Sequence, residues 1–374
     1  MINTDKNKEQ KISLLVVSLG KKYGGAEKYT LNLINSIQKF SYDIHVAVRE
    51  DGGLVSKIKN CHLIKLDLDR RSIITSIYKL KRYIDYNNIS VIHCNGINAM
   101  FFALFLKKNI KKIAVIHGDT ALDHKDMGFI KSKIFPVAEV LFIKKFDKCI
   151  VVSESLKEIL IKKGVKRNKV EVIYNGIELY NYDSYADINN PILKICNVGN
   201  LLKVKGQIFL LEALKYLKNN YPEIKYECDI YGMGDCYEEL YNFITENHLS
   251  NVCLKGFDDS VRNRLNNYHI YVQPSLYESF GLSVVEAINA GCYVIGSDTG
   301  GIKEILNILD CGETFPIGNY KEIALIIKKL YENRELLAND KLKTIEKIKY
   351  KFSNIGMVNK LDKIYRGSSY ENKD

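Results

Sequence analysis

The chain has 374 residues, of which 46% are hydrophobic and 26% are charged. These values are typical of a globular protein and exclude a disordered, collagen-like or coiled-coil chain, while the length predicts two domains. The longest apolar run, residues 99–106, is too short to span a bilayer, and residues 1–10 lack the apolar stretch of a signal peptide. The nine cysteines include no Cys-x-x-Cys pair, which indicates neither a disulfide framework nor a zinc site. We therefore expect a folded cytoplasmic protein.

The net charge of +11 is unevenly divided along the chain. Residues 1–183 carry 32 Lys and Arg against 19 Asp and Glu, whereas residues 184–374 carry 23 against 25. A basic half with lysines beside apolar segments suits an anionic membrane surface, but the lysines are equally explained as solvated side chains of a Lys-rich chain. The candidate membrane contacts are Lys107, Lys108, Lys111, Lys112, Lys144 and Lys145, beside Phe101, Phe102 and Phe142.

The first half alternates short apolar runs with amphipathic stretches, which predicts strands and helices around a parallel sheet. Helical patterns lie at residues 26–40 and 155–164. The expected strands are residues 12–19, 43–48, 90–95, 112–118 and 148–153.

The same alternation restarts after residue 190, which predicts a second sheet of the same kind. Between the two, residues 179–192 are polar, poorly periodic and contain one of only five prolines, so we place the interdomain linker there. The expected strands of the second sheet are residues 193–199, 225–232, 251–257, 269–275 and 292–298. We thus expect an N-terminal domain at 1–183, a C-terminal domain at 190–350, and a C-terminal helix and tail at 351–374.

Residues 273–301 place two carboxylates, Glu278 and Glu286, in a segment otherwise suited to burial. A strand ending at Pro274 and a helix ending at Gly291 predict that Glu278 lies on a strand-to-helix loop. Such loops bind ligands in open parallel sheets, and the amides at a helix start can bind an anion. The alternative is that Glu278 stabilises the helix start electrostatically and Glu286 lies on the solvated face of the helix.

The spacing Glu278-x7-Glu286 resembles the Glu-x7-Glu motif of retaining glycosyltransferases of family 4, which have the GT-B fold. Further segments resemble that family in the same order along the chain. They are YGGAEKYTLNL (23–33), VIYNGIE (172–178), VGNLLKVKG (198–206), IYGMGD (230–235), LKGF (254–257) and GSDTGGIKEIL (296–306). The resemblance implies an α/β protein with two Rossmann-like parallel-sheet domains that face each other across a cleft.

The resemblance also implies roles for individual residues. Lys205 would pair with the donor diphosphate, Glu278 would contact sugar hydroxyls, and Glu286 would hold the ribose. Asn200 stands where the family has an arginine, and an amide cannot replace a bidentate guanidinium at phosphate; Lys203 could supply the missing charge or face solvent. The other donor-binding residues that the resemblance implies are Gly24, Gly25, Gly232, Ser279, Phe280, Gly281 and Leu282.

His117 resembles the histidine that the family places against the donor sugar, and His93 also ends a predicted strand. We favour His117 as catalytic, although a strand-end histidine is commonly a hydrogen-bonded structural residue. No Asp-x-Asp pair ends a predicted strand, and the resemblance implies that basic residues and helix dipoles bind the diphosphate. We therefore expect no catalytic metal and no other cofactor.

The resemblance as a whole implies a retaining enzyme that moves a hexosyl or N-acetylhexosaminyl unit from a nucleotide diphosphate sugar, with a UDP-sugar as the expected donor. The implied acceptor is a lipid-linked glycan of bacterial surface polysaccharide, such as O-antigen or capsule. The enzyme would then be peripheral on the inner face of the cell membrane. Two alternatives stay open: a nucleotide-sugar epimerase of the same fold, and a basic nucleic-acid-binding protein. The latter is disfavoured because no nucleic-acid-binding motif accompanies the charge.

Overall fold

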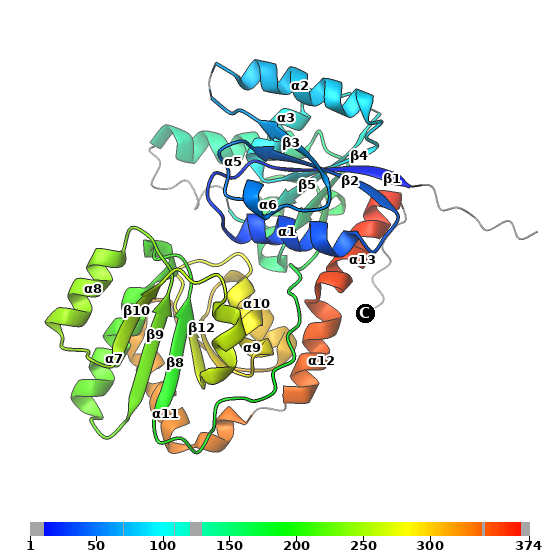
Figure 1. Cartoon of the computed structure of the whole chain (residues 1–374). Coiled ribbons are helices and arrows are strands. Elements are labelled where there is room, and N and C mark those ends of the chain that lie inside the picture. The colour runs from blue at the N-terminus through cyan, green and yellow to red at the C-terminus, as the bar shows by residue number, and fades with distance from the viewer. Residues whose placement is uncertain (1–10, 70, 108, 120–128, 339–340, 368–374) are drawn as a thin grey trace, which may run out of the picture. The chain divides into compact units, whose positions relative to one another are not determined.

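The computed structural model describes residues 11–69, 71–107, 109–119, 129–338 and 341–367, without the side chains of 129–133 and 341–342. The described residues form two compact units. The first comprises residues up to Gly176 together with the segment from Asn354 onward, and the second comprises Ile177–Ser353. Each contains one parallel sheet with helices packed on it (Figure 1).

The first unit has a seven-stranded sheet in the order β3-β2-β1-β4-β5-β6-β7, with every pair of neighbours parallel. The central strands β1, β4 and β5 are largely buried along their length, as expected for a sheet covered on both faces. The strands are β1 (Ile12–Ser18), β2 (Tyr42–Arg49), β3 (His62–Leu66), β4 (Val91–Asn95), β5 (Lys111–Ile116), β6 (Lys148–Val151) and β7 (Val170–Val172). The helices are α1 (Gly25–Ile37), α2 (Ile73–Tyr86), α3 (Ile97–Ala103), α5 (Phe129–Ile143), α6 (Glu154–Lys162) and α13 (Asn354–Arg366), with short 3-10 turns η1 (Val55–Lys57) and η2 (Arg167–Lys169).

The second unit repeats this topology in a six-stranded parallel sheet ordered β10-β9-β8-β11-β12-β13. Helix α7 packs against α8 and α11, while α9, α10 and α12 pack against one another on the other side (Figure 1). The strands are β8 (Leu193–Val198), β9 (Tyr226–Tyr231), β10 (Val252–Gly256), β11 (Ile270–Gln273), β12 (Tyr293–Ser297) and β13 (Glu313–Phe315). The helices are α7 (Gln207–Asn220), α8 (Tyr237–Glu246), α9 (Leu282–Asn289), α10 (Gly300–Leu309), α11 (Tyr320–Glu332) and α12 (Lys341–Lys351), with 3-10 turns η3 (Lys203–Lys205), η4 (Val261–Asn267) and η5 (Arg334–Leu337).

The prediction of two parallel sheets joined by helices is confirmed. All ten expected strands are present, and the helix expected to end at Gly291 is α9, which ends at Asn289. Strands β3, β7 and β13 were not predicted; each is five residues or fewer and lies at or beside a sheet edge.

The boundaries between the units differ from the expected domain limits of 1–183, 190–350 and 351–374. Helix α13 belongs to the first unit, because Met357, Val358 and Leu361 are buried in its core and α13 packs on α1 (Figure 1). The segment expected to be a linker is held on the second unit instead. The Ala186 amide donates to Asn266 O (2.7 Å), and the Tyr182 hydroxyl donates to Arg262 O (2.7 Å).

Strand order reverses between β1 and β4 in the first unit and between β8 and β11 in the second. The loops that leave these strands at their carboxyl ends diverge to opposite sides, so a crevice opens between them in which open α/β sheets bind ligands. Ligand-binding residues are therefore expected in the loops after β1 and β4, and in those after β8 and β11.

Candidate functional site

The clearest polar contact at the second unit's switch point joins Lys205 to Glu278. Lys205 ends η3 in the loop after β8, and Glu278 lies in the loop after β11. Lys205 Nζ lies 2.6 Å from Glu278 Oε2, and the two side chains are 23% and 15% exposed. The loops are also joined through the backbone, because the Leu276 amide donates to Val204 O (2.8 Å). An ammonium and a carboxylate thus face each other at the end of the sheet where ligands bind.

Helix α9 begins directly after this loop. Its N-cap residue, Gly281, has φ +101°, a left-handed conformation that glycine adopts without strain. The Gly301 amide at the start of α10 donates to Glu278 O (2.9 Å), and a Cβ on Gly301 would lie 2.4 Å from Phe280 Cα. Close packing thus fixes the loop. The Val284 and Val285 amides donate to Gly281 O (3.0 and 3.3 Å), which leaves the Leu282 and Ser283 amides without an acceptor in the helix.

Two glycine turns follow β8 and β9 at the same end of the sheet. The Gly199 amide donates to Tyr231 O (3.0 Å), and a Cβ on Gly232, whose φ is +146°, would lie 1.9 Å from Gly199 O. The turns after β8 and β9 therefore touch backbone to backbone. Asn200 follows Gly199; its side chain is exposed, and its carbonyl accepts from Gln207 Nε2 (3.1 Å).

Glu286 lies one turn after Leu282 on the same face of α9 and is half-buried. Tyr180 and Tyr182, from the segment that enters the second unit, lie near it. Burial raises the pKa of Tyr182 above its usual value, and the negative charge of Glu286 adds to this effect. Glu286 thus stands beside aromatic side chains, farther along the helix than the pair of Lys205 and Glu278.

A buried polar network beneath the site was not predicted from the sequence. The Tyr271 hydroxyl lies within hydrogen-bonding distance of Gln273 Oε1 (2.6 Å), Ser283 Oγ (2.8 Å) and Val198 O (3.0 Å). It therefore links β8, β11 and α9. The available signal was a tyrosine and a glutamine within the apolar strand IYVQ, where polar groups need partners.

In the first unit, Gly24 and Gly25 begin α1. The Gly24 amide donates to Glu27 Oε2 (3.0 Å), and a Cβ on Gly20 would overlap the Glu27 carboxylate. Glu27 is buried, and this burial raises the pKa of its carboxyl above the usual value. A Cβ on Gly25 would meet nothing within 4 Å, so packing does not require that glycine. Sequence reasoning missed Glu27, whose signal was an acid three residues into a helix start.

His117 follows the end of β5, whereas His93 lies in the middle of the neighbouring strand β4 and not at its end as expected. His93 is 0% exposed, and its Nδ1 lies 2.6 Å from the Tyr365 hydroxyl of α13. His117 follows β5, is half-buried, and bonds through Nε2 to Asn95 Oδ1 at the end of β4. Tyr29 of α1 packs against both rings. His93 is therefore an interior residue, whereas His117 reaches the carboxyl end of the sheet.

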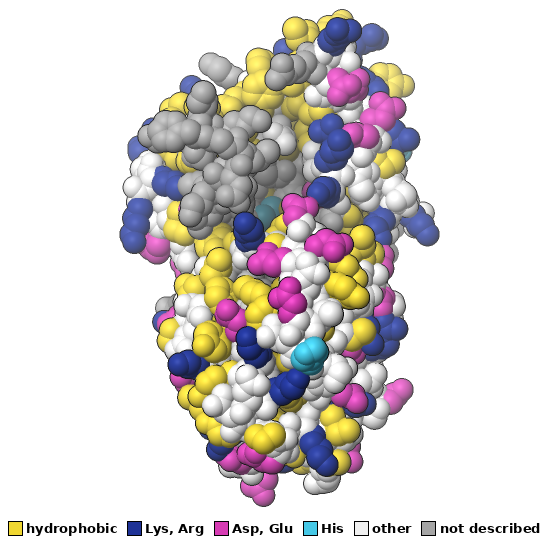
Figure 2. All heavy atoms as spheres, turned by 90° about the vertical axis from the view of Figure 1, so that its left-hand side faces the viewer, with side chains coloured by type: hydrophobic (Ala, Val, Ile, Leu, Met, Phe, Trp, Pro, Cys, Tyr) yellow, Lys and Arg dark blue, Asp and Glu magenta, His cyan; other side chains and the backbone are white. Residues whose placement is uncertain are grey.

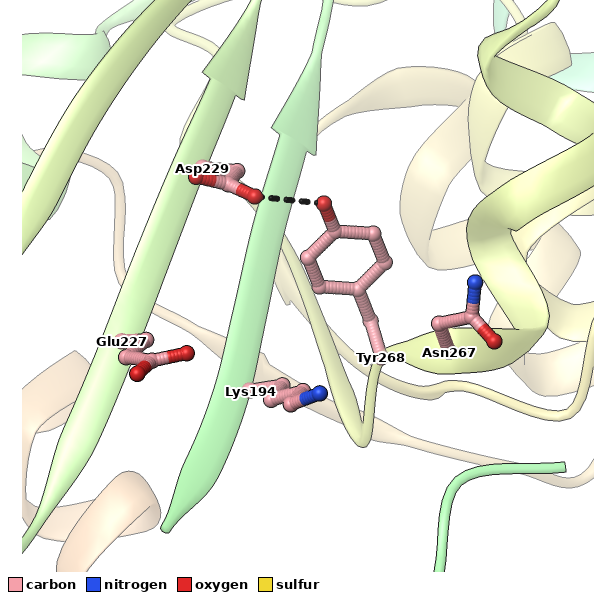
Figure 3. A pocket seen from close by; sticks show the side chains of 5 residues that line it. All are labelled: Lys194, Glu227, Asp229, Asn267 and Tyr268. Carbon is pink, nitrogen blue, oxygen red and sulfur yellow. Dashed lines mark hydrogen bonds between the residues drawn. The ribbon is translucent and has the colours of Figure 1, made fainter.

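A separate polar hollow of about 240 Å³ lies on the β8–β9 face of the second unit (Figure 3). It is lined by Lys194, Glu227, Asp229, Asn267 and Tyr268. The Tyr268 hydroxyl donates to Asp229 Oδ2 (2.6 Å), so this carboxylate of the hollow already has a partner (Figure 3). None of the predicted site residues lines this hollow.

The predicted basic face is partly internal. Lys112 is 9% exposed and donates to Leu106 O (3.1 Å), Lys111 donates to Ile364 O of α13, and Phe102 is buried. Lys112 and Phe102 are too buried to contact a membrane in this structure, and the ammonium of the half-buried Lys111 is bound to α13. Lys108 lies outside the described residues. On the face seen in Figure 2, the coloured Lys and Arg side chains are dispersed among acidic and uncharged ones.

Two further observations concern metals and membranes. Within the described ranges, no group of three or more His, Cys, Asp or Glu is arranged to hold a metal ion. No helix in those ranges combines the length and the apolar composition needed to cross a bilayer.

The site and the fold together define a class of enzyme, the glycosyltransferases built from two such sheets. Residues 23–180 match the model of Glycosyltransferase Family 4, and residues 186–347 match that of Glycosyl transferases group 1. An uncharacterized glycosyltransferase of Methanocaldococcus jannaschii is 30% identical over 272 residues, which cover 71% of this chain and 72% of the relative. The chain therefore belongs to the group 1 and family 4 glycosyltransferases and has the GT-B fold.

Two other similarities are informative. The Escherichia coli UDP-Gal:alpha-D-GlcNAc-diphosphoundecaprenol alpha-1,3-galactosyltransferase is 25% identical over 323 residues, covering 79% of this chain and 82% of the relative. The structure of Anabaena HepE in complex with UDP-glucose superposes with a TM-score of 0.78, at 17% identity, over 95% of this chain and 100% of that one. The protein is thus a glycosyltransferase related, at low identity, to enzymes of bacterial lipid-linked polysaccharide.

Proposed function

We propose that this enzyme transfers a hexosyl or N-acetylhexosaminyl unit from a UDP-sugar, with retention at the anomeric carbon, to a lipid-linked glycan of bacterial surface polysaccharide. The observation that carries the proposal is the contact between Lys205 and Glu278 at the second unit's switch point, beside the start of α9. The UDP-glucose bound by HepE and the undecaprenol-linked acceptor in the name of the Escherichia coli relative support the choice of substrates.

The proposed chemistry follows from charge. When the glycosidic bond breaks, the departing diphosphate gains negative charge, and the Lys205 ammonium with the first amides of α9 stabilises that charge. Glu278 would otherwise repel the diphosphate, but the Lys205 ammonium neutralises it and could contact both. Glu278 also has oxygens with which to accept hydrogen bonds from sugar hydroxyls.

The remaining proposed contacts surround this pair. Glu286 would accept hydrogen bonds from the ribose diol, and Gly232 and the loop from Ser279 would let the backbone approach the donor. Asn200 can give only a neutral hydrogen bond, so we assign Lys205 the main share of diphosphate binding. Because a lysine and a helix start supply the positive charge, we propose that transfer needs no metal and no other cofactor.

In the first unit, His117 would face the donor sugar, and the open space beside Gly25 would leave room for donor or acceptor. His117 is preferred to His93 because the latter is enclosed by Tyr29 and Tyr365.

We further propose that the acceptor is reached at an anionic membrane surface through α5. Three exposed apolar side chains, Ile134, Val137 and Leu141, are 59%, 61% and 54% exposed and share one face of the helix at positions i, i+3 and i+7. Lys144 and Lys145 follow directly and are exposed. Apolar insertion next to lysines is the pattern that binds anionic lipid. We propose this surface in place of the buried residues Lys112 and Phe102 and of Lys111, whose ammonium is bound to α13.

The deciding experiment screens nucleotide sugars by thermal shift and then analyses the product of the best ligand. A ligand at a hundred times its Kd adds about 2.7 kcal/mol to stability, so a UDP-sugar should raise the melting temperature clearly. The anomeric configuration of the product, read from proton couplings in NMR, should equal that of the donor. No shift with any nucleotide sugar, or an inverted product, would refute the proposal. Conversion of the donor without an acceptor would indicate an epimerase.

A further inference from the structure

The side-chain amide of Asn95 is held between α1 and His117 in one orientation. Asn95 Nδ2 lies 2.9 Å from Ala26 O and 2.6 Å from Thr30 Oγ1. A carbonyl oxygen can only accept, so the end of the amide that faces Ala26 must be the NH2 group. With the amide turned over, two oxygen acceptors would face each other at hydrogen-bonding distance.

Thr30 uses the second proton of that NH2 group. Its hydroxyl lies 3.0 Å from Ala26 O and donates there, so its lone pairs remain to accept from Asn95. Both protons of the Asn95 amide are therefore used on α1, and Asn95 Oδ1 is left to face His117.

The proton on His117 follows from this arrangement. Asn95 Oδ1 can only accept, so His117 Nε2 must carry the hydrogen that joins them. His117 Nδ1 has no hydrogen-bond partner in the part of the chain that the structure describes. Burial lowers the pKa of His117 to about 4, so the ring is neutral at pH 7.

Among the described residues, the rings packed around His117 carry no charge that would reverse this assignment. Tyr29 of α1 packs edge-on against the ring, with centroids 4.7 Å apart, and also stacks on His93 of β4. Both are buried and uncharged at neutral pH. Asp119, two residues after His117, forms an ion pair with Lys163.

We infer that Asn95 is a positioning residue that holds His117 as the neutral imidazole with its proton on Nε2, leaving only an acceptor position, Nδ1, unused on the ring. The inference rests on the proposed place of His117 beside the donor sugar. Under it, His117 contributes to transfer as an uncharged polar group and does not donate a proton to the leaving diphosphate. Asn95 acts through His117 and not on the substrate.

The test uses the full-length protein with 15N-labelled histidine and long-range 1H–15N correlation spectra, with His117→Gln to assign the signals. The expected result is a protonated Nε2 and an unprotonated Nδ1 on His117 from about pH 8 to about pH 5.5, above the lowered pKa. A proton on Nδ1, or on both nitrogens at neutral pH, would overturn the inference. This measurement needs no variant of Asn95, so it stands even if such variants unfold.

The matched variant is Asn95→Asp, which replaces the neutral acceptor with a charged one. A carboxylate beside Nε2–H should raise the pKa of His117 by roughly 1–3 pH units. Transfer by this variant should therefore fall as the pH is lowered and the His117 ring becomes protonated. An unshifted pKa in a folded Asn95→Asp protein would contradict the contact. His45 serves as an internal reference, because its Nε2 lies 3.1 Å from Asp43 Oδ2; Asp43→Asn should alter the His45 signals and leave those of His117 unchanged.

Asn95→Ala separates positioning from simple structure. Loss of the acceptor in Asn95→Ala should lower kcat about 10- to 100-fold with little change in the donor KM. Asn95→Ser keeps an acceptor, so its kcat should lie between those of Asn95→Ala and the wild type. Equal losses in both variants would assign Asn95 a structural role only. The spectra do not depend on catalysis. An absence of nucleotide-sugar binding would therefore refute the proposed function, whereas the position of the His117 proton would still be decided by the spectra alone.

Discussion

The ammonium group of Lys205 lies 2.6 Å from the Glu278 carboxylate, although the two residues are 73 positions apart in the chain. The contact brings the loops after β8 and β11 together at the point where the strand order reverses. It also neutralises a carboxylate in a loop that would otherwise repel an anionic ligand.

Removing the ammonium should therefore affect transfer more than folding. We expect Lys205→Ala to lower kcat about a hundredfold, since one preorganised charge donor contributes this much in other enzymes. Steady-state transfer assays measure it, with Lys225→Ala as the control, because Lys225 is exposed and precedes β9 at the other end of the sheet. Wild-type kinetics in Lys205→Ala would show that Lys205 does not take part in transfer.

Glu286 should act in donor binding. Its replacement by Ala removes a contact made equally in the ground state and the transition state, so the donor KM should rise about tenfold while kcat changes less. The control is Glu246→Ala, an exposed acid at the end of α8. If kcat fell with an unchanged KM, Glu286 would instead act in the chemical step.

The glycine turns permit a matched pair of stability measurements. Gly232→Ala places a Cβ 1.9 Å from Gly199 O, whereas Gly256→Ala, at φ +72°, meets nothing within 4 Å. Gly256→Ala should lower the free energy of unfolding by about 1 kcal/mol through backbone strain alone. Gly232→Ala should lower it by roughly 3 kcal/mol or more, because strain and overlap add. Thermal unfolding should rank them in that order; equal losses would contradict the close approach of the two turns.

Acid should destabilise the first unit through its buried histidines. Burial lowers the pKa of His93 to about 3, below an unfolded value near 6.5. The unfolded state then binds more protons than the folded state between these values, so stability is complete above pH 6.5 and declines as the pH falls toward 3.

His93→Gln removes this titration. The loss of stability between about pH 6.5 and 4.5 should be smaller in the variant by on the order of 2–3 kcal/mol, measured as melting temperature against pH. His248→Gln, at an exposed position, should follow the wild type. An identical acid profile in His93→Gln would show that His93 takes up its proton as readily in the folded state.

The proposed membrane surface on α5 can be tested with vesicles of anionic and neutral lipid. Changing Lys144 and Lys145 to Gln should weaken binding about tenfold or more, because each lysine contributes roughly 1 kcal/mol near an anionic surface. Leu141→Asn should weaken it independently of salt. Leu325→Asn, at an exposed apolar position on α11, should have no effect. Failure of the wild type to sediment with anionic vesicles at low salt would favour a soluble acceptor.

The two sheets and the position of α9 could be predicted because continuous apolar runs and strand-to-helix loops are local features. Lys205 and Glu278 could each be placed at a loop, but their contact could not, since it depends on how two distant loops pack. The orientation of Asn95 was equally hidden, because the sequence HCNG gives a polar strand end without its partners.

Two other predictions were wrong because the surroundings of a residue depend on long-range packing, which a local sequence pattern does not contain. The periodicity of residues 354–366 predicts a helix but carries no information about which core buries it, and here α13 packs on α1. Lys112 was expected to face a membrane or solvent, because lysines usually lie at the surface. Its ammonium instead donates to Leu106 O, and the residue is only 9% exposed.

The return of α13 to the first unit affects the synthesis of this protein on the ribosome. Residues up to Gly176 are made first, yet their apolar surface around Leu33 and Ile34 is completed only by Met357, Val358 and Leu361. At 5–20 residues per second, the intervening segment takes about 10 to 40 seconds to translate. The nascent first unit therefore waits with an uncovered hydrophobic surface while the second unit can already fold, which makes it the part of the chain most in need of a chaperone.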